Sequence, residues 1–239
     1  MNFFVFVIAV LLSISALQAQ EQTIGIGRLQ VSLNHDIPLY DAKTGLSVDT
    51  IKFSVIESGK DEGKFVKTTS FFALKPMEFY VGDSKIEAYE SINWGLVYFA
   101  PNLAFRVLQR SDNEFLVVLN EKTFETAIIK NNTTHKLYTL GRPYWNMTHN
   151  SSSSDEVWFL YETWETYLKR LMYVGIEGNK LYDNINGNEI NSSENFWGVV
   201  VVEVKGHWAK LQDEEKRVMW VKWTDGKKFL IEPVVEIYF

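Results

Sequence analysis

The residues of this chain best suited to binding chemistry are aromatic side chains near its C-terminus. In the segment VMWVKW, strand alternation places Trp220 and Trp223 on opposite faces. One indole therefore lies outside the core, where it is either covered by another element or lines a groove. Aromatic grooves suit proline-rich peptides, glycan rings and peptidoglycan stems. We predict that Tyr182, Trp197 and Trp208 line a ligand-binding groove.

Side chains for nucleophilic or acid–base catalysis form no recognisable constellation. Cysteine is absent, no Gly-x-Ser-x-Gly motif occurs, and His207 is interpreted as an exposed turn residue. Glu162 and Glu165 could form the carboxylate pair of a glycosidase, but we interpret both as solvated charges on the outer face of a helix. We predict no catalytic residues. A secreted hydrolase with dispersed acidic residues is the alternative.

The segment DNINGNE, which begins at Asp183, resembles a calcium-binding loop. Oxygen donors alternate along it, and Glu194 stands at the twelfth position. Helices flank a calcium loop of that kind, whereas both flanks here look like strands. We therefore interpret the segment as a hairpin tip with left-handed backbone angles, and expect neither a metal ion nor a cofactor.

The charge of the chain bears on its partners. The net charge is −6 and no block of Lys and Arg could follow a phosphate backbone, which argues against nucleic acid. We expect a cell-wall, protein or peptide ligand instead.

The N-terminus has the pattern of a signal peptide. Residues 3–12 are almost all apolar, and residues 13–19 are mostly small or polar. We predict a signal peptide over residues 1–19 with cleavage after Ala19, and an uncleaved anchor is the alternative. The expected location is the periplasm or the exterior, without stable membrane insertion of the cleaved chain.

Short strands and one helix are predicted along the rest of the chain. Closely spaced β segments with turn residues between them predict an antiparallel unit over residues 20–130. Residues 131–154 are rich in Asn, Ser and Thr and predict a linker or exposed loop. An amphipathic helix is expected over residues 155–174, and a second β unit over residues 175–239.

The helix prediction rests on the spacing of its apolar residues. They recur at steps of three, four or seven: Val157, Tyr161, Trp164, Leu168, Leu171 and Met172. Ser153 and Glu156 fit a capping box, and Glu165 with Lys169 forms an i,i+4 pair. We expect the apolar face to pack between the two β units.

Two pairs of segments indicate an internal repeat. LYDAKTG at Leu39 matches LYDNING at Leu181, with the same Leu-Tyr-Asp start and the same Gly. NEFLVVLNEK matches GHWAKLQDEE, and this match aligns Phe115 with Trp208. The first copy carries a long insertion, roughly residues 53–93.

At these residues the chain resembles bacterial SH3-like domains of secreted proteins. The matching features are the Leu-Tyr-Asp start, Gly206-His207-Trp208, and Trp220-Val221 followed by Asp225-Gly226. Met219 stands where the family usually has glycine, and about the last sixty residues match well. The resemblance implies tandem SH3-like units, the second clearer than the first, in a Gram-negative secreted or periplasmic protein.

The sequence thus predicts a mainly β protein with two small SH3-like antiparallel barrels and one linking amphipathic helix. Its expected function is non-catalytic extracytoplasmic binding, through an aromatic surface that recognises cell-envelope material, either peptidoglycan or peptide. A structural or assembly subunit of an envelope complex is a further alternative.

Overall fold

The computed structural model describes residues 22–31, 35–55, 65–70, 72–79, 103–132, 136–139, 158–171, 173–190 and 198–234. The predicted signal peptide, most of the predicted linker, Glu194 and Trp197 lie outside these residues. In the part of the chain that is described, no helix is long and apolar enough to cross a membrane.

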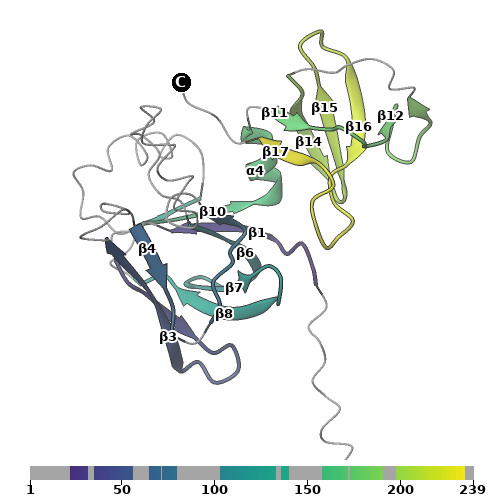
Figure 1. Cartoon of the computed structure of the whole chain (residues 1–239). Coiled ribbons are helices and arrows are strands. Elements are labelled where there is room, and N and C mark those ends of the chain that lie inside the picture. Colours follow the sequence, from purple (N-terminus) through teal and green to yellow (C-terminus); the bar gives the residue numbers. More distant parts are fainter. Residues whose placement is uncertain are drawn as a thin grey trace, which may run out of the picture.

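The first unit is one large sheet of ten strands. Figure 1 labels β1, β3, β4, β6, β7, β8 and β10 of this sheet. The strand order is β4-β3-β2-β8-β7-β6-β1-β10-β9, and β5 pairs with β6. The strands are β1 (Gly27–Val31), β2 (Ile37–Tyr40), β3 (Ser47–Val55), β4 (Phe65–Thr68), β5 (Glu78–Phe79), β6 (Leu103–Arg110), β7 (Glu114–Asn120), β8 (Glu125–Lys130), β9 (Lys136–Tyr138) and β10 (Trp158–Thr163). Its core holds Leu29, Phe105 and Phe115 among its fully buried side chains.

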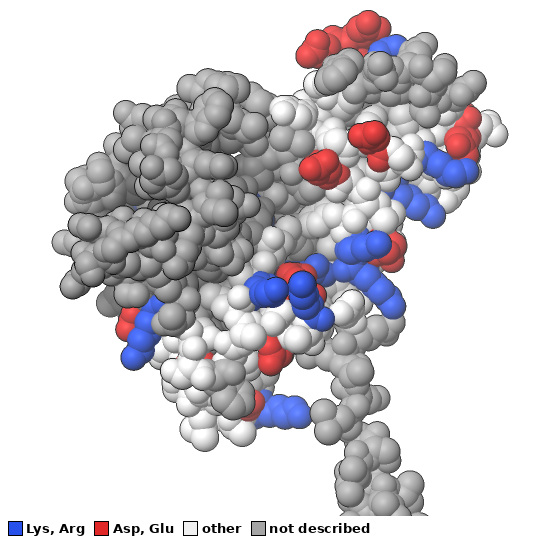
Figure 2. Space-filling view, viewed as in Figure 1, with Lys and Arg blue, Asp and Glu red and all other residues white. Residues whose placement is uncertain are grey.

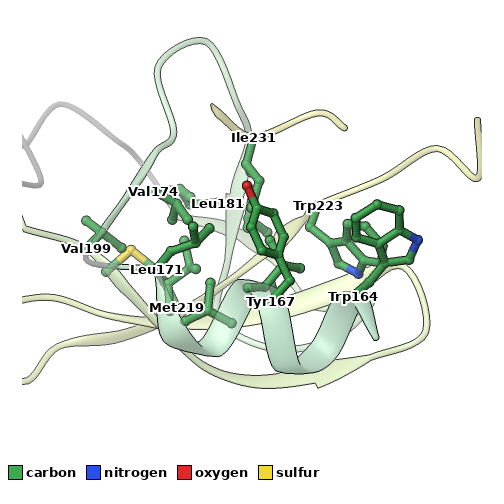
Figure 3. Packing of buried hydrophobic residues seen from close by; sticks show 14 of the residues in the cluster. Trp164, Tyr167, Leu171, Val174, Leu181, Val199, Met219, Trp223 and Ile231 are labelled. Atoms are coloured by element: carbon green, nitrogen blue, oxygen red, sulfur yellow. The ribbon is translucent and has the colours of Figure 1, made fainter. Parts of the chain in front are cut away.

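The second unit combines two smaller sheets with a helix. Its five-stranded sheet has the order β13-β12-β16-β15-β14, and β11 pairs with β17. The elements are α4 (Trp164–Arg170), β11 (Tyr173–Gly175), β12 (Leu181–Tyr182), β13 (Glu189–Ile190), β14 (Val200–Lys205), β15 (Trp208–Gln212), β16 (Val218–Lys222) and β17 (Glu232–Val234). Helix α4 and the inner face of the sheet enclose one core, in which Trp164 and Trp223 lie together at one end and Leu171 and Val199 toward the other (Figure 3).

The mainly β class predicted from the sequence is confirmed. Within the described residues the strands form sheets with open ends, and no pairing closes them into barrels. The predicted hairpin at Asp183 is also confirmed, because β12 pairs with β13 and Asn186 has a φ of 56° at the tip.

The predicted helix over residues 155–174 is wrong in its first half. Residues Trp158–Thr163 form strand β10, which pairs with β1 on one side and β9 on the other. Five of its six residues are buried, and the four apolar ones fall on both faces of the strand, so their spacing can imitate a helix. Helix α4 begins after Thr163, whose side chain accepts a hydrogen bond from Thr166 N, and the Glu165–Lys169 pair lies at 3.5 Å.

The unit boundaries shift accordingly. Strand β9 lies inside the predicted linker and pairs in parallel with β10, so both belong to the first sheet. The first unit therefore extends to Thr163. The second unit begins with α4 rather than after it.

The two units share one strand order, which supports the predicted repeat. In the first unit β3-β2-β8-β7-β6 are neighbours, and in the second β13-β12-β16-β15-β14. In both runs the strands occur in the same relative order along the chain, and every neighbouring pair is antiparallel. The matching Leu-Tyr-Asp segments occupy the same strand: Leu39 faces Ile129, and Leu181 faces Val221.

A β-bulge at the same place in both units fixes the alignment of their strands. In the first it lies between Val107 and Gln109, opposite Val117 and Leu116. In the second it lies between Val201 and Glu203, opposite Leu211 and Lys210. A bulge adds one unpaired residue and bends its strand, so a shared bulge marks equivalent positions.

This alignment corrects the sequence match by one residue. It places Glu114, not Phe115, at the position of Trp208, because Glu114 faces Lys130 as Trp208 faces Lys222. A slip of one residue moves a side chain to the other face of a sheet. Phe115 accordingly lies in the core of its unit, whereas Trp208 does not.

The N-terminal segment joins the two units. Ile24 N donates to the Gly226 carbonyl at 2.6 Å, and the Trp164 indole donates to the carbonyls of Ile24 and Gly25, both at 3.0 Å. Gly25 has a φ of 73°, and a Cβ there would lie 2.2 Å from the Val107 carbonyl oxygen. Only glycine fits this passage between the units.

A partly buried ion pair completes the joint. The Arg106 guanidinium binds both carboxylate oxygens of Glu121, at 3.1 and 2.5 Å. It also donates to the carbonyl of Thr23 at 2.8 Å and to that of Lys227 at 2.7 Å. Burial raises the pKa of Glu121, against the opposing effect of the Arg106 charge. One side chain of the first unit thus holds the N-terminal segment and a turn of the second unit.

Asp213 offers a test of the β15–β16 turn. Burial acts to raise its pKa, but hydrogen bonds from the Arg217 backbone and guanidinium lower it overall from the ordinary 3.8. The ionised carboxylate therefore stabilises the fold fully above pH 3.8, and this contribution is lost as the pH falls through the lowered value. Asp213→Asn should lower the free energy of unfolding at pH 7, with a difference from wild type that shrinks below pH 3.8.

Urea denaturation at a series of pH values measures this difference. Asp112→Asn, at an exposed position in the β6–β7 turn, is the matched control and should behave like wild type. A difference between wild type and Asp213→Asn that is the same at every pH would contradict the assignment.

Candidate binding surface

The residues of β16 divide between the two faces of the second sheet as the sequence predicts. Met219, Val221 and Trp223 belong to the core beneath helix α4. Trp220 and Lys222 point to the opposite face, and Trp220 belongs to none of the core clusters of the described residues. The predicted placement of Trp220 and Trp223 on opposite faces is confirmed, and Trp220 lies outside the core cluster beneath α4 although only 6% of it is exposed.

Cross-strand pairing gathers further aromatic and charged residues on that outer side. Trp220 faces Tyr182 on β12 and Lys210 on β15, while Trp208 faces Lys222 on β16. We call this surface the aromatic face; it consists of Tyr182, Glu203, Lys205, Trp208, Lys210, Trp220 and Lys222.

Two rings of the aromatic face touch above the strand between them. Tyr182 on β12 and Trp208 on β15 meet edge to face, with ring centroids 5.1 Å apart. Strand β16 lies between their strands, so the contact crosses the sheet. Edge-to-face packing is a favourable geometry for aromatic pairs and holds both rings in place.

Lysine side chains cover the indoles. The Lys222 ammonium lies 5.3 Å from the Trp208 ring, and those of Lys205 and Lys210 lie 5.7 and 5.9 Å from the Trp220 ring. The two indoles are only 8% and 6% exposed, although they lie on the side of the sheet away from the core. Ammonium–ring contacts at exposed sites are worth about 0.5–1 kcal/mol, so these covers can move aside at low cost.

Positive charge exceeds negative charge on the aromatic face. Glu203 is its one carboxylate among the residues just named, and it pairs with Lys205 at 2.6 Å and Lys210 at 4.0 Å. The hydrogen bond from Lys205 lowers the pKa of Glu203, with help from the charges of Lys205, Lys210 and Lys169. On the side of the molecule drawn in Figure 2, Lys and Arg residues are interspersed with Asp and Glu residues.

The first unit shows that the fold does not require this surface. Tyr40 corresponds to Tyr182, but Glu114 takes the place of Trp208 and Ile128 the place of Trp220. Lys130 lies over the Tyr40 ring at 4.5 Å and forms a 3.0 Å ion pair with Glu114. The same strand order is thus built without either indole.

The predicted site residues fall into two groups. The structure brings Tyr182 and Trp208 together, and their assignment to a ligand site stays a prediction. Trp197 lies outside the described residues. Trp220 and the three lysines were not predicted as site residues, since cross-strand register, which brings them together, is not evident from the sequence.

A second group of polar side chains is buried in the first unit. The prediction that Glu162 is a solvated helix charge is wrong: it lies on β10, is 1% exposed and forms an ion pair with Arg170. Arg28 faces it across the β1–β10 pair and places its guanidinium 4.5 Å from the Tyr167 ring. Glu162 and Glu121 are thus each tied to an arginine, an arrangement that serves packing between the sheet and its neighbours.

Metal ligands do not converge in the described residues. No group of three or more His, Cys, Asp or Glu side chains there could hold a metal ion. In the turn that resembles a calcium loop, Asp183 accepts a hydrogen bond from Asn188 N at 2.9 Å, as a hairpin tip requires.

No family model matches the sequence, and no curated protein or solved structure is significantly similar to it.

Removal of the lysine covers should expose the indoles without unfolding the chain. In a Lys205→Ala, Lys210→Ala, Lys222→Ala variant, we expect acrylamide to quench tryptophan fluorescence more strongly than in wild type. The free energy of unfolding should fall by no more than about 1 kcal/mol per lysine, because these contacts are weak.

Lys130→Ala is the matched control, because Lys130 covers a tyrosine at the equivalent place in the first unit. It should leave tryptophan quenching unchanged. Equal quenching of wild type and the triple variant would show that these lysines do not shield the rings.

Proposed function

We propose that this chain is a non-catalytic binding protein of the periplasm or cell exterior. It recognises cell-envelope material, peptidoglycan or a peptide, through the aromatic face of its second unit. The contact residues are Tyr182, Trp208 and Trp220, with the lysines beside them. Trp197, predicted from the sequence, joins them in the proposal.

The observation that carries the proposal is the contrast between the two units. Both have the same strand order and the same bulge, yet Trp208 and Trp220 of the second unit are replaced by Glu114 and Ile128 in the first. Residues needed for folding alone would be expected at equivalent positions in both. In the first unit a carboxylate (Glu114) and an aliphatic residue (Ile128) occupy these positions.

The chemistry of the face fits a ligand with flat or ring-shaped parts. Indole and phenol rings give a large contact area at a small entropic cost, and they dominate the energetics of binding sites. Weakly held lysine covers let a ligand replace the ammonium groups over the rings. The ring pair of Tyr182 and Trp208 gives that surface a fixed shape.

The extracytoplasmic location is supported by the N-terminal sequence. An apolar run followed by small residues is typical of a signal peptide, and the absence of cysteine is compatible with export. The resemblance to bacterial SH3-like domains supports a cell-wall ligand. Binding is favoured over hydrolysis because the carboxylates of Glu121 and Glu162 are already paired with arginines.

Retention on insoluble peptidoglycan tests the proposal. The chain from Gln20 onward should sediment with peptidoglycan, and Tyr182→Ser should weaken retention at least about fivefold, since loss of a contact ring costs about 1 kcal/mol or more. Trp208→Leu should weaken it further, with circular dichroism to show that the sheet is intact.

Tyr40→Ser is the matched control, because Tyr40 holds the equivalent position in the first unit. It should bind as wild type does. Absence of wild-type retention at both low and moderate salt would rule out peptidoglycan as the ligand. Equal losses for Tyr40→Ser and Tyr182→Ser would show that the aromatic face is not the contact surface.

A further inference from the structure

We infer that the ligand of the aromatic face is anionic and that its carboxylate groups replace the rings as partners of Lys205, Lys210 and Lys222. This inference rests on the proposed function and names the chemical class that the face selects. A carboxylate-bearing wall polymer would bind, whereas the same polymer with its carboxylates neutralised would not.

The charge of the face is the first support. Three lysines surround the two indoles, and Glu203 is the one carboxylate that pairs with them among the described residues. At the edge of the sheet, Lys180 and Glu189 form a 2.7 Å pair that is neutral overall. The face is therefore positive in a chain whose net charge is −6, so its sign is local and does not follow from the composition.

Lys222 gives the strongest support, by comparison with its counterpart. In the first unit, Lys130 faces Glu114 and forms a 3.0 Å ion pair with it. In the second unit, the position opposite Lys222 is Trp208. Within the described part of the chain, no carboxylate pairs with Lys222, and its ammonium lies over the indole instead. An external carboxylate could restore the ion pair that the first unit makes internally.

The three lysines can reorient at little cost. The side chain of Lys205 is 60% exposed and that of Lys210 is 34% exposed, so a ligand can reach both ammonium groups from solvent. An ammonium is a compact point charge on a flexible stem, which suits it to follow a carboxylate. Each lysine that turns outward also uncovers part of an indole. The same lysine movement therefore allows an ion pair with the ligand and a contact between the ligand and the indole ring.

The experiment compares chemically modified forms of one wall material. Peptidoglycan with its carboxylates converted to neutral amides by carbodiimide and ethanolamine is the test substrate. Peptidoglycan with its amines acetylated, which keeps the carboxylates, is the control for modification. Retention of the full mature chain should fall at least about fivefold on the amidated material and stay unchanged on the acetylated material.

Lysine variants supply the matching change on the protein. Lys222→Gln should weaken retention about two- to fivefold on untreated peptidoglycan, the range of one exposed ion pair, and should have no effect on amidated peptidoglycan. Lys222→Arg keeps the charge and should restore most of the retention. Lys130→Gln, at the equivalent place in the first unit, should bind as wild type does.

The outcomes separate this inference from the proposed function. Equal retention on untreated and amidated peptidoglycan would overturn the inference. The aromatic face would then bind its ligand without contacting the ligand's carboxylates. An unchanged Lys222→Gln variant would overturn the role of that lysine. Absence of retention on untreated peptidoglycan would overturn both, because the inference depends on binding.

Discussion

Alternation of side chains across antiparallel strands is the constraint on which the rest of this structure depends. It assigns every second residue of β12, β14, β15 and β16 to a core closed by helix α4, and leaves the others to the opposite side. The inner residues must fill one space and cannot change independently. The outer residues carry no such requirement, so a binding surface could arise there without any change in the core.

The joint between the units is built from backbone groups and two side chains. Arg106 and Trp164 donate to carbonyls of the N-terminal segment, and Arg106 also reaches the Lys227 carbonyl. Removal of the Trp164 indole would leave the buried Ile24 carbonyl without this donor, which is costly. The Trp164 ring also packs edge to face on Phe229 at 5.1 Å, so the same residue belongs to the joint and to the second core.

Sequence patterns predicted features that depend on near neighbours and missed those that depend on register. The Leu-Tyr-Asp hairpins and the opposite faces of Trp220 and Trp223 follow from local alternation and turn residues. Strand β10 was predicted as a helix because an apolar run buried on both faces lacks a distinguishing period. The lysine covers and the pairing of Glu114 with Lys130 depend on which strands are neighbours and on a bulge, which no local pattern shows.

The central claim is that the outer rings of the second unit contact a ligand while its inner rings do not. Indole N–H signals in a two-dimensional NMR spectrum, assigned with single-tryptophan variants, test it directly during titration with soluble peptidoglycan fragments. The indoles of Trp164 and Trp223 donate to the carbonyls of Ile24 and Gly206, and both serve as internal references. We expect the Trp208 and Trp220 signals to shift while those of Trp164 and Trp223 stay fixed. Shifts confined to Trp164 and Trp223, or no shift of any indole at saturating fragment, would contradict the account.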